Sequence, residues 1–252
     1  MDVQERQRRI EQTVAAEENV TVADLAARLA TSEATIRRDL IELDSRGVLR
    51  RVHGGARRLA LRGAELSYAS RATANVDVKA RIAAAVTGRL GADESVLLDS
   101  GTTCVEIARA VGDRPLRVMP LSLTAANVLA AFPNVRLICP GGEVRAGELA
   151  FVGPLAEAGI RRLRFDTAVV SGCGASVAGG VTAYDLGDAA VKTAAIDCAE
   201  RVILVFDSSK WEKSTFAWVA DLKTFDLVVT DHRFTPAESA FFERTGVEVV
   251  TV

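Results

Sequence analysis

The chain has 252 residues, of which 49 % are apolar and 25 % are charged. These values are close to the averages of globular domains, so they exclude a disordered or collagen-like chain. The length fits one large domain, or a mid-sized domain that carries a small one. The formal net charge of −2, taken alone, argues against a chain that simply coats nucleic acid.

The sequence also argues against membrane, secreted and metal-binding proteins. No apolar run approaches the roughly 18–20 residues that span a bilayer, so we expect no membrane segment. The charged first residues, MDVQERQRRI, lack a following apolar stretch, and we therefore expect no secretory signal and a cytoplasmic protein. The four cysteines form no C-x-x-C pair and the chain has only two histidines, so we expect no metal site and no cofactor.

The mean charge hides an asymmetry between two parts of the chain. The first 62 residues carry 12 arginines and ten acidic residues, a net charge of +2. This leaves 19 basic and 23 acidic residues for the rest, a net charge of −4. Residues 46–62 hold six arginines and no acid. A basic cluster before an acidic body is typical of a nucleic-acid module attached to another domain, with an ordinary solvated face as the alternative.

The N-terminal part follows the pattern of three helices. We expect the first over Val3–Glu18 and a second that begins at Thr21, before a tight break at Ala30-Thr31. Ser32 can cap the third helix. Its buried face carries apolar residues, and its opposite face presents polar ones near the N-terminus, namely Thr35, Arg37 and Arg38. This arrangement predicts a helix-turn-helix, whose second helix enters the major groove of DNA.

The next segment predicts a basic β-hairpin. Residues 48–53 have a strand pattern, Gly54-Gly55 offers a two-residue turn, and residues 56–59 can return. Such a wing places its arginines on the phosphate backbone of DNA. For His53, beside the turn, a packing role and a hydrogen bond to DNA remain equally open.

Helices and strands alternate through the remainder of the chain. We expect helices at 76–90, 103–111, 123–131, 153–161, 187–199 and 236–244, and strands at 95–99, 116–121, 135–139, 165–171, 202–206, 226–230 and 247–251. Strands such as VILVF are apolar throughout, as in sheets that helices cover on both faces. The sequence therefore predicts a DNA-binding domain over 1–58, a linker over 59–75, and an α/β domain with a mostly parallel sheet over 76–252.

Ligands of such sheets bind at the carboxyl ends of the strands. The run DSGTT, residues 99–103, follows a strand and opens a helix, where free N–H groups can hold a phosphate; a plain capped turn is the alternative. Three further polar runs are expected at the same edge of the sheet: PGGEVR at 140–145, GGVTAYD at 179–185, which ends at Asp185, and DSSK at 207–210. Together they predict a polar, anion-tolerant pocket.

The stretch TSEATIRRDLIELDSRGVLRRVHGGA, residues 31–56, resembles the DNA-binding signature of the DeoR family of bacterial transcriptional regulators. The resemblance implies a winged helix-turn-helix that binds double-stranded operator DNA. On this basis the expected DNA-binding residues are Thr21, Ser32, Thr35, Arg37, Arg38, Arg51, His53, Gly54 and Arg57.

The motifs DSGTT, PGGEVR, FVGP, DAAVK and DSSK, in this order, resemble the sensor domain of the same family. That domain is similar to the fold of ribose-phosphate isomerase and CoA transferases, and it generally senses phosphorylated sugars. The family usually shows Thr-Asn followed by Ser or Asn where this chain has Pro120-Leu121-Ser122, which leaves the effector's binding mode open. The expected effector-binding residues are Asp99, Gly101, Thr102, Thr103, Ser122, Gly141, Gly142, Asp185, Lys192 and Lys210.

Three functions remain open at this point. We favour a homo-oligomeric repressor (dimer or tetramer) of a sugar-metabolism operon, relieved by a phosphorylated sugar and without enzymatic activity. The first alternative is an isomerase- or transferase-like enzyme with a DNA-binding head, which needs a carboxylate base such as Asp99, Asp185 or Asp207. The second is a regulator whose sensor only oligomerises, which Pro120-Leu121 motivates.

Overall fold

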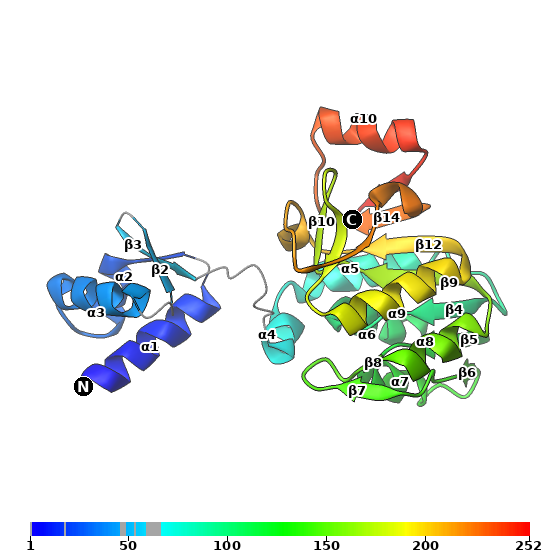
Figure 1. Ribbon diagram of the computed structural model, residues 1–252, viewed down its shortest axis with the longest axis horizontal. Coiled ribbons are helices and arrows are strands. Elements are labelled where there is room, and N and C mark those ends of the chain that lie inside the picture. Colours follow the sequence, from blue (N-terminus) through cyan, green and yellow to red (C-terminus); the bar gives the residue numbers. More distant parts are fainter. Residues whose placement is uncertain (1, 18, 46–48, 53, 59–66) are drawn as a thin grey trace. The chain divides into compact units, whose positions relative to one another are not determined.

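The computed structural model describes residues 2–17, 19–45, 49–52, 54–58 and 67–252 (Figure 1). The chain divides into two compact units, Met1–Leu61 and Arg62–Val252. One hydrophobic cluster lies in the first unit and two lie in the second. Within the described residues, no helix is both long and apolar enough to cross a membrane.

The first unit combines three helices with a small sheet. α1 (Val3–Ala16), α2 (Val22–Arg28) and α3 (Glu33–Ser45) are followed by the hairpin of β2 (Leu49–Val52) and β3 (Gly55–Arg58). The predicted helix-turn-helix and its wing are therefore present. A strand that was not predicted, β1 (Asn19–Thr21), pairs with β3 and completes a sheet of order β1-β3-β2. The core is apolar and consists mainly of Ile10, Val14, Leu25, Ile36, Leu40, Leu43 and Leu49.

An ion pair fixes α1 against α3. Arg6 Nε donates to Oδ2 of Asp39 at 2.6 Å, and its terminal Nη2 donates to Oδ1 at 3.2 Å. The pair is largely shielded from solvent, since 13 % of the Arg6 side chain and 6 % of the Asp39 side chain are exposed. Two parallel hydrogen bonds define the geometry as well as the energy, so this pair holds α3 in one orientation.

The second unit is built on a seven-stranded sheet of order β15-β14-β12-β9-β4-β5-β6. All six pairings in it are parallel. This confirms the predicted α/β domain. The strands are β4 (Ser95–Leu98), β5 (Leu116–Pro120), β6 (Val135–Leu137), β9 (Phe165–Ser171), β12 (Ala199–Val205), β14 (Leu227–Thr230) and β15 (Glu248–Thr251).

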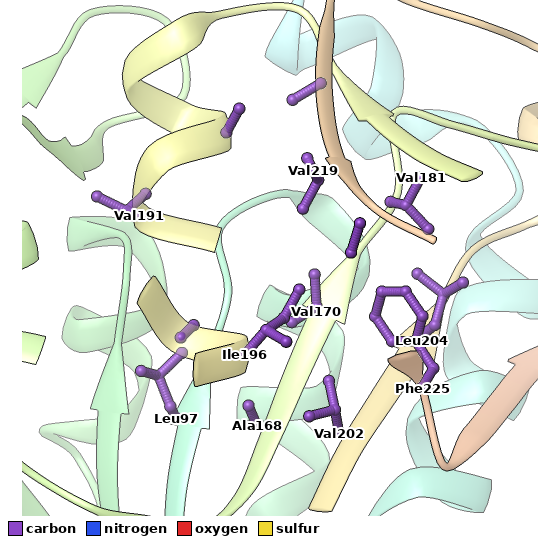
Figure 2. Close-up of a cluster of buried hydrophobic side chains, with 14 of the residues drawn as sticks. Leu97, Ala168, Val170, Val181, Val191, Ile196, Val202, Leu204, Val219 and Phe225 are labelled. Atoms are coloured by element: carbon purple, nitrogen blue, oxygen red, sulfur yellow. The ribbon is translucent and has the colours of Figure 1, made fainter. Parts of the chain in front are cut away.

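Successive residues of the central strands serve two hydrophobic cores on opposite faces of this sheet. Leu97, Val170 and Leu204 belong to one cluster, together with residues of α9 (Leu186–Asp197) (Figure 2). Residues of α8 (Pro154–Arg161) belong to the same cluster. Leu98 and Val205 belong to the other cluster, together with α5 (Val76–Thr87), α6 (Thr102–Val111) and α7 (Leu123–Leu129). Both faces are therefore covered by helices, which explains why the strands are apolar throughout.

Several shorter elements complete this unit. β7 (Glu143–Arg145) and β8 (Ala150–Val152) form a hairpin, and β10 (Gly174–Ser176), β11 (Gly180–Ala183) and β13 (Ala217–Ala220) form an antiparallel sheet. Neither small sheet was predicted. α4 (Tyr68–Thr73) lies in the stretch expected to be a linker, and α10 (Pro236–Thr245) precedes β15. Two single 3-10 turns are formed by Ser208–Lys210 and Leu222–Thr224.

Candidate functional site

The N-terminal turn of α3 presents a polar surface. Ser32 Oγ accepts a hydrogen bond from the backbone N–H of Thr35 at 3.2 Å and so caps the helix as expected. Its hydroxyl lies 2.9 Å from that of Thr35. The preceding turn is closed by the N–H of Thr31, which donates to the carbonyl of Ala26 at 3.0 Å. Ala30 takes the left-handed conformation there, with φ at 47°.

Both arginines at the start of α3 are exposed. Arg37 pairs with Glu33 one turn earlier at 2.5 Å, whereas Arg38 has no polar partner among the described residues. Arg38 lies on the face opposite the buried Leu40, so its five N–H donors point to solvent and are available to a base edge or a phosphate.

The wing adds further exposed cations. Arg51 on β2 and Arg57 on β3 are exposed, and Gly54 occupies the hairpin turn with φ at 81°. Thr21 caps α2 by accepting a hydrogen bond from the N–H of Asp24 at 3.1 Å. His53 lies outside the described residues. The other expected DNA-binding residues therefore lie at the starts of α2 and α3 and along the wing.

A buried ion cluster lies at the carboxyl end of the parallel sheet. Lys192 Nζ, on α9, donates to Oδ2 of Asp99 and lies 3.5 Å from Oδ1 of Asp188. At most 4 % of each of these three side chains is exposed. Burial lowers the pKa of Lys192, but the charges of Asp188 and Asp99 outweigh it, so the pKa is raised above the ordinary lysine value.

Asp99 also organises the backbone around it. Its Oδ1 accepts from the N–H of Ser100 at 2.7 Å, and its Oδ2 accepts from the N–H of Ser171 at 2.8 Å. The end of β4, the end of β9 and helix α9 thus meet at one carboxylate. Immediately afterwards Gly101, with φ at 99°, turns the chain into α6 in a conformation that favours glycine.

A pocket that opens to solvent lies next to this cluster, since Ser171, which donates to Asp99, is one of its lining residues. The N-terminus of α6 forms one side, where no side chain of the described residues caps the helix. The hydroxyls of Thr102 and Thr103 have no hydrogen-bond partner among the described residues. Three cationic side chains complete the lining, namely Arg71, Lys79 and Lys210. The positive end of the helix and these cations together give the pocket a positive electrostatic potential.

The surroundings of two of these cationic side chains lower their pKa values. Burial lowers the pKa of Lys210, which the charge of Asp207 only partly restores. Burial likewise lowers the pKa of Lys79, whose Nζ donates to the carbonyl oxygens of Arg71 and Ala74. Asp207 accepts from the N–H of Ser209 at 3.0 Å and from Nδ2 of Asn75 at 3.2 Å. A bound anion would offset the cost of burying these lysines.

The structure brings part of the expected effector site together. Gly101, Thr102, Thr103 and Lys210 line the pocket. Asp99 and Lys192 lie in the ion cluster and not among the lining residues. Asp185 caps α9 by accepting from the N–H of Asp188 at 2.9 Å, and Ser122 caps α7 by accepting from that of Ala125 at 3.2 Å.

The two glycines of the PGGEVR run lie elsewhere. Neither Gly141 nor Gly142 lines the pocket. A Cβ at Gly142 would lie 3.0 Å from the backbone nitrogen of Ala156 and 3.1 Å from the carbonyl of Val152, so this glycine permits close packing of α8 and β8. Leu121 is fully buried in the hydrophobic core, and neither it nor Pro120 lines the pocket.

Sequence reasoning missed several pocket residues. Arg71 and Asn75 lie in the stretch expected to be a linker, where no periodicity marked a helix. Lys79 on α5 and Cys173 after β9 come from segments whose own patterns say nothing of a ligand. Tyr184 precedes Asp185 in a run expected at this edge, but no role was predicted for its side chain. The sequence offers one signal for Lys79, which is a lone lysine on the apolar side of an expected helix. In the structure its side chain is indeed buried.

The comparisons with known proteins agree with this two-part arrangement. Residues 6–60 match the DeoR-like helix-turn-helix domain, and residues 74–232 match the DeoR C-terminal sensor domain. The HTH-type transcriptional regulator GlpR of Haloferax volcanii is 35 % identical over 98 % of this chain and 96 % of its own length. The glycerol-3-phosphate regulon repressor of Escherichia coli K12 is 29 % identical over 84 % of each chain.

Among solved structures, ribose 5-phosphate isomerase A of Methanocaldococcus jannaschii matches over 56 % of each chain, with a TM-score of 0.42 and 14 % identity. A helix-turn-helix unit joined to a sensor domain defines a ligand-responsive DNA-binding regulator. The chain belongs to the DeoR family of transcriptional regulators.

The buried ion cluster generates a prediction of stability. Replacing Lys192 by Met should leave Asp99 and Asp188 close together without a cation, at a cost of about 3–5 kcal/mol in the free energy of unfolding. Chemical denaturation at pH 7 measures this cost. Lys223→Met, at an exposed pair with Asp221, is the matched control and should change little. Equal stabilities of the two variants would contradict the role assigned to the cluster.

Proposed function

We propose that the protein is a repressor of a sugar-metabolism operon and that a phosphorylated sugar in the second unit releases it from its operator. The main observation is that the N-terminus of α6, which has no side-chain cap, and Lys210 line the same pocket, in a chain whose first domain is a winged helix-turn-helix. The family's sensor-domain description and the name of the Escherichia coli relative support a phosphorylated metabolite.

The phosphate of the effector would bind at α6. The N–H groups of Thr102 and Thr103 belong to the first turn of a helix without a side-chain cap, and both hydroxyls can donate to phosphate oxygens. Lys210, which lines the same pocket, would supply a partly desolvated positive charge. The sugar hydroxyls would then meet the remaining polar lining, to which Asn75, Tyr184 and Ser209 contribute.

We expect the protein to act as a homo-oligomer in the cytoplasm. The first 62 residues have a net charge of only +2, so one DNA-binding unit has little attraction for DNA. Two such units bound to adjacent half-sites would double this charge and the number of base contacts. Edge strand β13 exposes 59 % of Trp218, and the preceding Phe216 is 70 % exposed, which are apolar surfaces that a second copy would cover. Sedimentation of the purified protein should give a dimer or a larger assembly; a monomer at micromolar concentration would contradict this.

We also expect binding without turnover. Asp99 is engaged by Lys192 and Asp207 by Asn75 and Ser209, so neither carboxylate is placed as an unengaged general base. The protein incubated with pentose and hexose phosphates should leave them chemically unchanged, as followed by NMR. Catalytic conversion of any of them would favour the enzyme alternative.

Base reading by α3 gives the first functional prediction. Arg38→Ala should weaken binding to the protein's operator by about 1–3 kcal/mol and relax specificity at one base position. Arg9→Ala, an exposed arginine on α1 paired with Glu5, is the matched control and should change affinity much less. Fluorescence anisotropy at fixed salt measures both. If the two variants bind alike, Arg38 is not a base-reading residue.

The pocket gives the second functional prediction. Lys210→Ala and Thr102→Val should retain operator binding but lose release by the phosphorylated sugar, because each removes a phosphate contact from the second unit only. A titration of the operator complex with a panel of phosphorylated sugars measures the response. Lys223→Ala is the control, since this lysine is exposed and pairs with Asp221. Wild-type release by either pocket variant would remove that residue from the site.

A further inference from the structure

The pocket contains a side chain from the segment that leads out of the DNA-binding unit. Arg71 lies on α4, the first described element after residues 59–66, and it lines the pocket together with residues of α6 and the 207–210 turn. No other residue of Tyr68–Thr73 lines that pocket. An anion at the α6 N-terminus would therefore share its space with a guanidinium that belongs to the connecting segment.

Arg71 already has an anionic partner. Its Nη2 forms an ion pair with Oε1 of Glu148, in the turn between β7 and β8. Only 14 % of the Arg71 side chain and 6 % of the Glu148 side chain are exposed. Because both charges are largely withdrawn from water, a second anion in the pocket competes with Glu148 for one guanidinium.

The backbone of α4 is tied to the pocket as well. Lys79 Nζ donates to the carbonyl oxygens of Arg71 and Ala74, which lie at the C-terminal end of α4. Asn75, in the left-handed conformation with φ at 53°, joins α4 to α5 and donates from Nδ2 to Asp207 at 3.2 Å. Since Lys79, Asn75 and Asp207 all line the pocket, a change in its charge acts on both the side chain and the backbone of this short helix.

We propose that Arg71 is an effector-contacting residue that exchanges Glu148 for the anion in the pocket and thereby moves α4. In the unliganded state Arg71 pairs with Glu148 and holds α4 in one position; in the liganded state its donors turn to the phosphate. In chain order α4 is the first described element after the DNA-binding unit, so a movement of α4 would bring a change in pocket occupancy to the start of the second unit. The inference rests on the proposed function, because it assumes an anionic effector.

The exchange has a thermodynamic consequence. If Glu148 competes with the ligand, removing its charge must strengthen anion binding, and Arg71 must be required for this gain. The two substitutions are therefore coupled, and a double-mutant cycle isolates their coupling from effects on the fold. A purely structural ion pair predicts the opposite for Glu148→Gln, namely unchanged or weaker anion binding.

The test uses the full-length chain with inorganic phosphate as the probe. Calorimetric titrations compare the wild type, Glu148→Gln, Arg71→Gln and the double variant. Arg81→Gln, an exposed arginine on α5 that does not line the pocket, is the control. We expect Glu148→Gln to bind phosphate roughly fivefold more tightly or better, at the lower end of ordinary coupling. Arg71→Gln should bind it more weakly, and the double variant should not regain affinity.

Hydrogen exchange of the peptide that covers residues 67–75 supplies the second measurement. Phosphate should change its exchange rate in the wild type and in Arg81→Gln but not in Arg71→Gln. Wild-type affinity of Glu148→Gln, or a phosphate-dependent change in Arg71→Gln, would overturn the proposal. Should Arg71→Gln fail to fold, the affinity of Glu148→Gln decides alone.

Different results would contradict the proposed function and the proposed role of Arg71. If no phosphorylated sugar releases the wild-type protein from its operator, the proposed function is contradicted, even if phosphate changes the hydrogen-exchange rate of α4. An operator complex that a phosphorylated sugar releases equally from wild type and Arg71→Gln supports the proposed function and contradicts the role of Arg71.

Discussion

The pairing of Lys192 with Asp99 and Asp188 is the constraint on which the rest of the second unit depends. A buried charge costs several kcal/mol unless a partner compensates it, so the three groups must meet. They come from β4 and α9, and Asp99 also holds the end of β9 through Ser171. Gly101 follows two residues after Asp99 and, with φ at 99°, turns the chain into α6, whose N-terminus lines the pocket.

The pocket is in turn an unfavourable place for cations until an anion arrives. The pKa values of Lys79 and Lys210 are both lowered, because withdrawing an ammonium group from water disfavours its charged form. Arg71 meets this cost by pairing with Glu148. A bound anion would compensate the buried charges of Lys79, Lys210 and Arg71 at once. Ligand binding would therefore act directly on the elements that carry these side chains, namely α4, α5 and the 207–210 turn.

Much of the fold follows from local patterns in the sequence. The helices of the first unit follow from apolar residues such as Ile36 and Leu40 one turn apart, and the parallel sheet follows from fully apolar strands. The small sheets were missed because strands of three or four residues, such as Gly174–Ser176, carry too few positions for a period of two to show. α4 was missed because its helix exposes most of its surface and has no apolar face.

The site was less predictable because its contacts join distant segments. Gly101 and Thr102 carry a local signal, a glycine turn before a helix, and both line the pocket. Lys192 gives no local sign that it is buried, since its partner Asp99 lies 93 residues earlier. Arg71 likewise pairs with an acid in a distant turn. Such pairings are set by the packing of α9 and of the β7–β8 hairpin, which periodicity does not report.

We propose above all that a phosphate group binds where α6 begins. The most direct measurement is a crystal structure of the full chain grown with the phosphorylated sugar that most stabilises it against thermal unfolding. We expect the phosphate to lie within hydrogen-bond distance of the N–H groups of Thr102 and Thr103 and of Nζ of Lys210. A sugar phosphate bound elsewhere, with the α6 N-terminus facing only water, would contradict it.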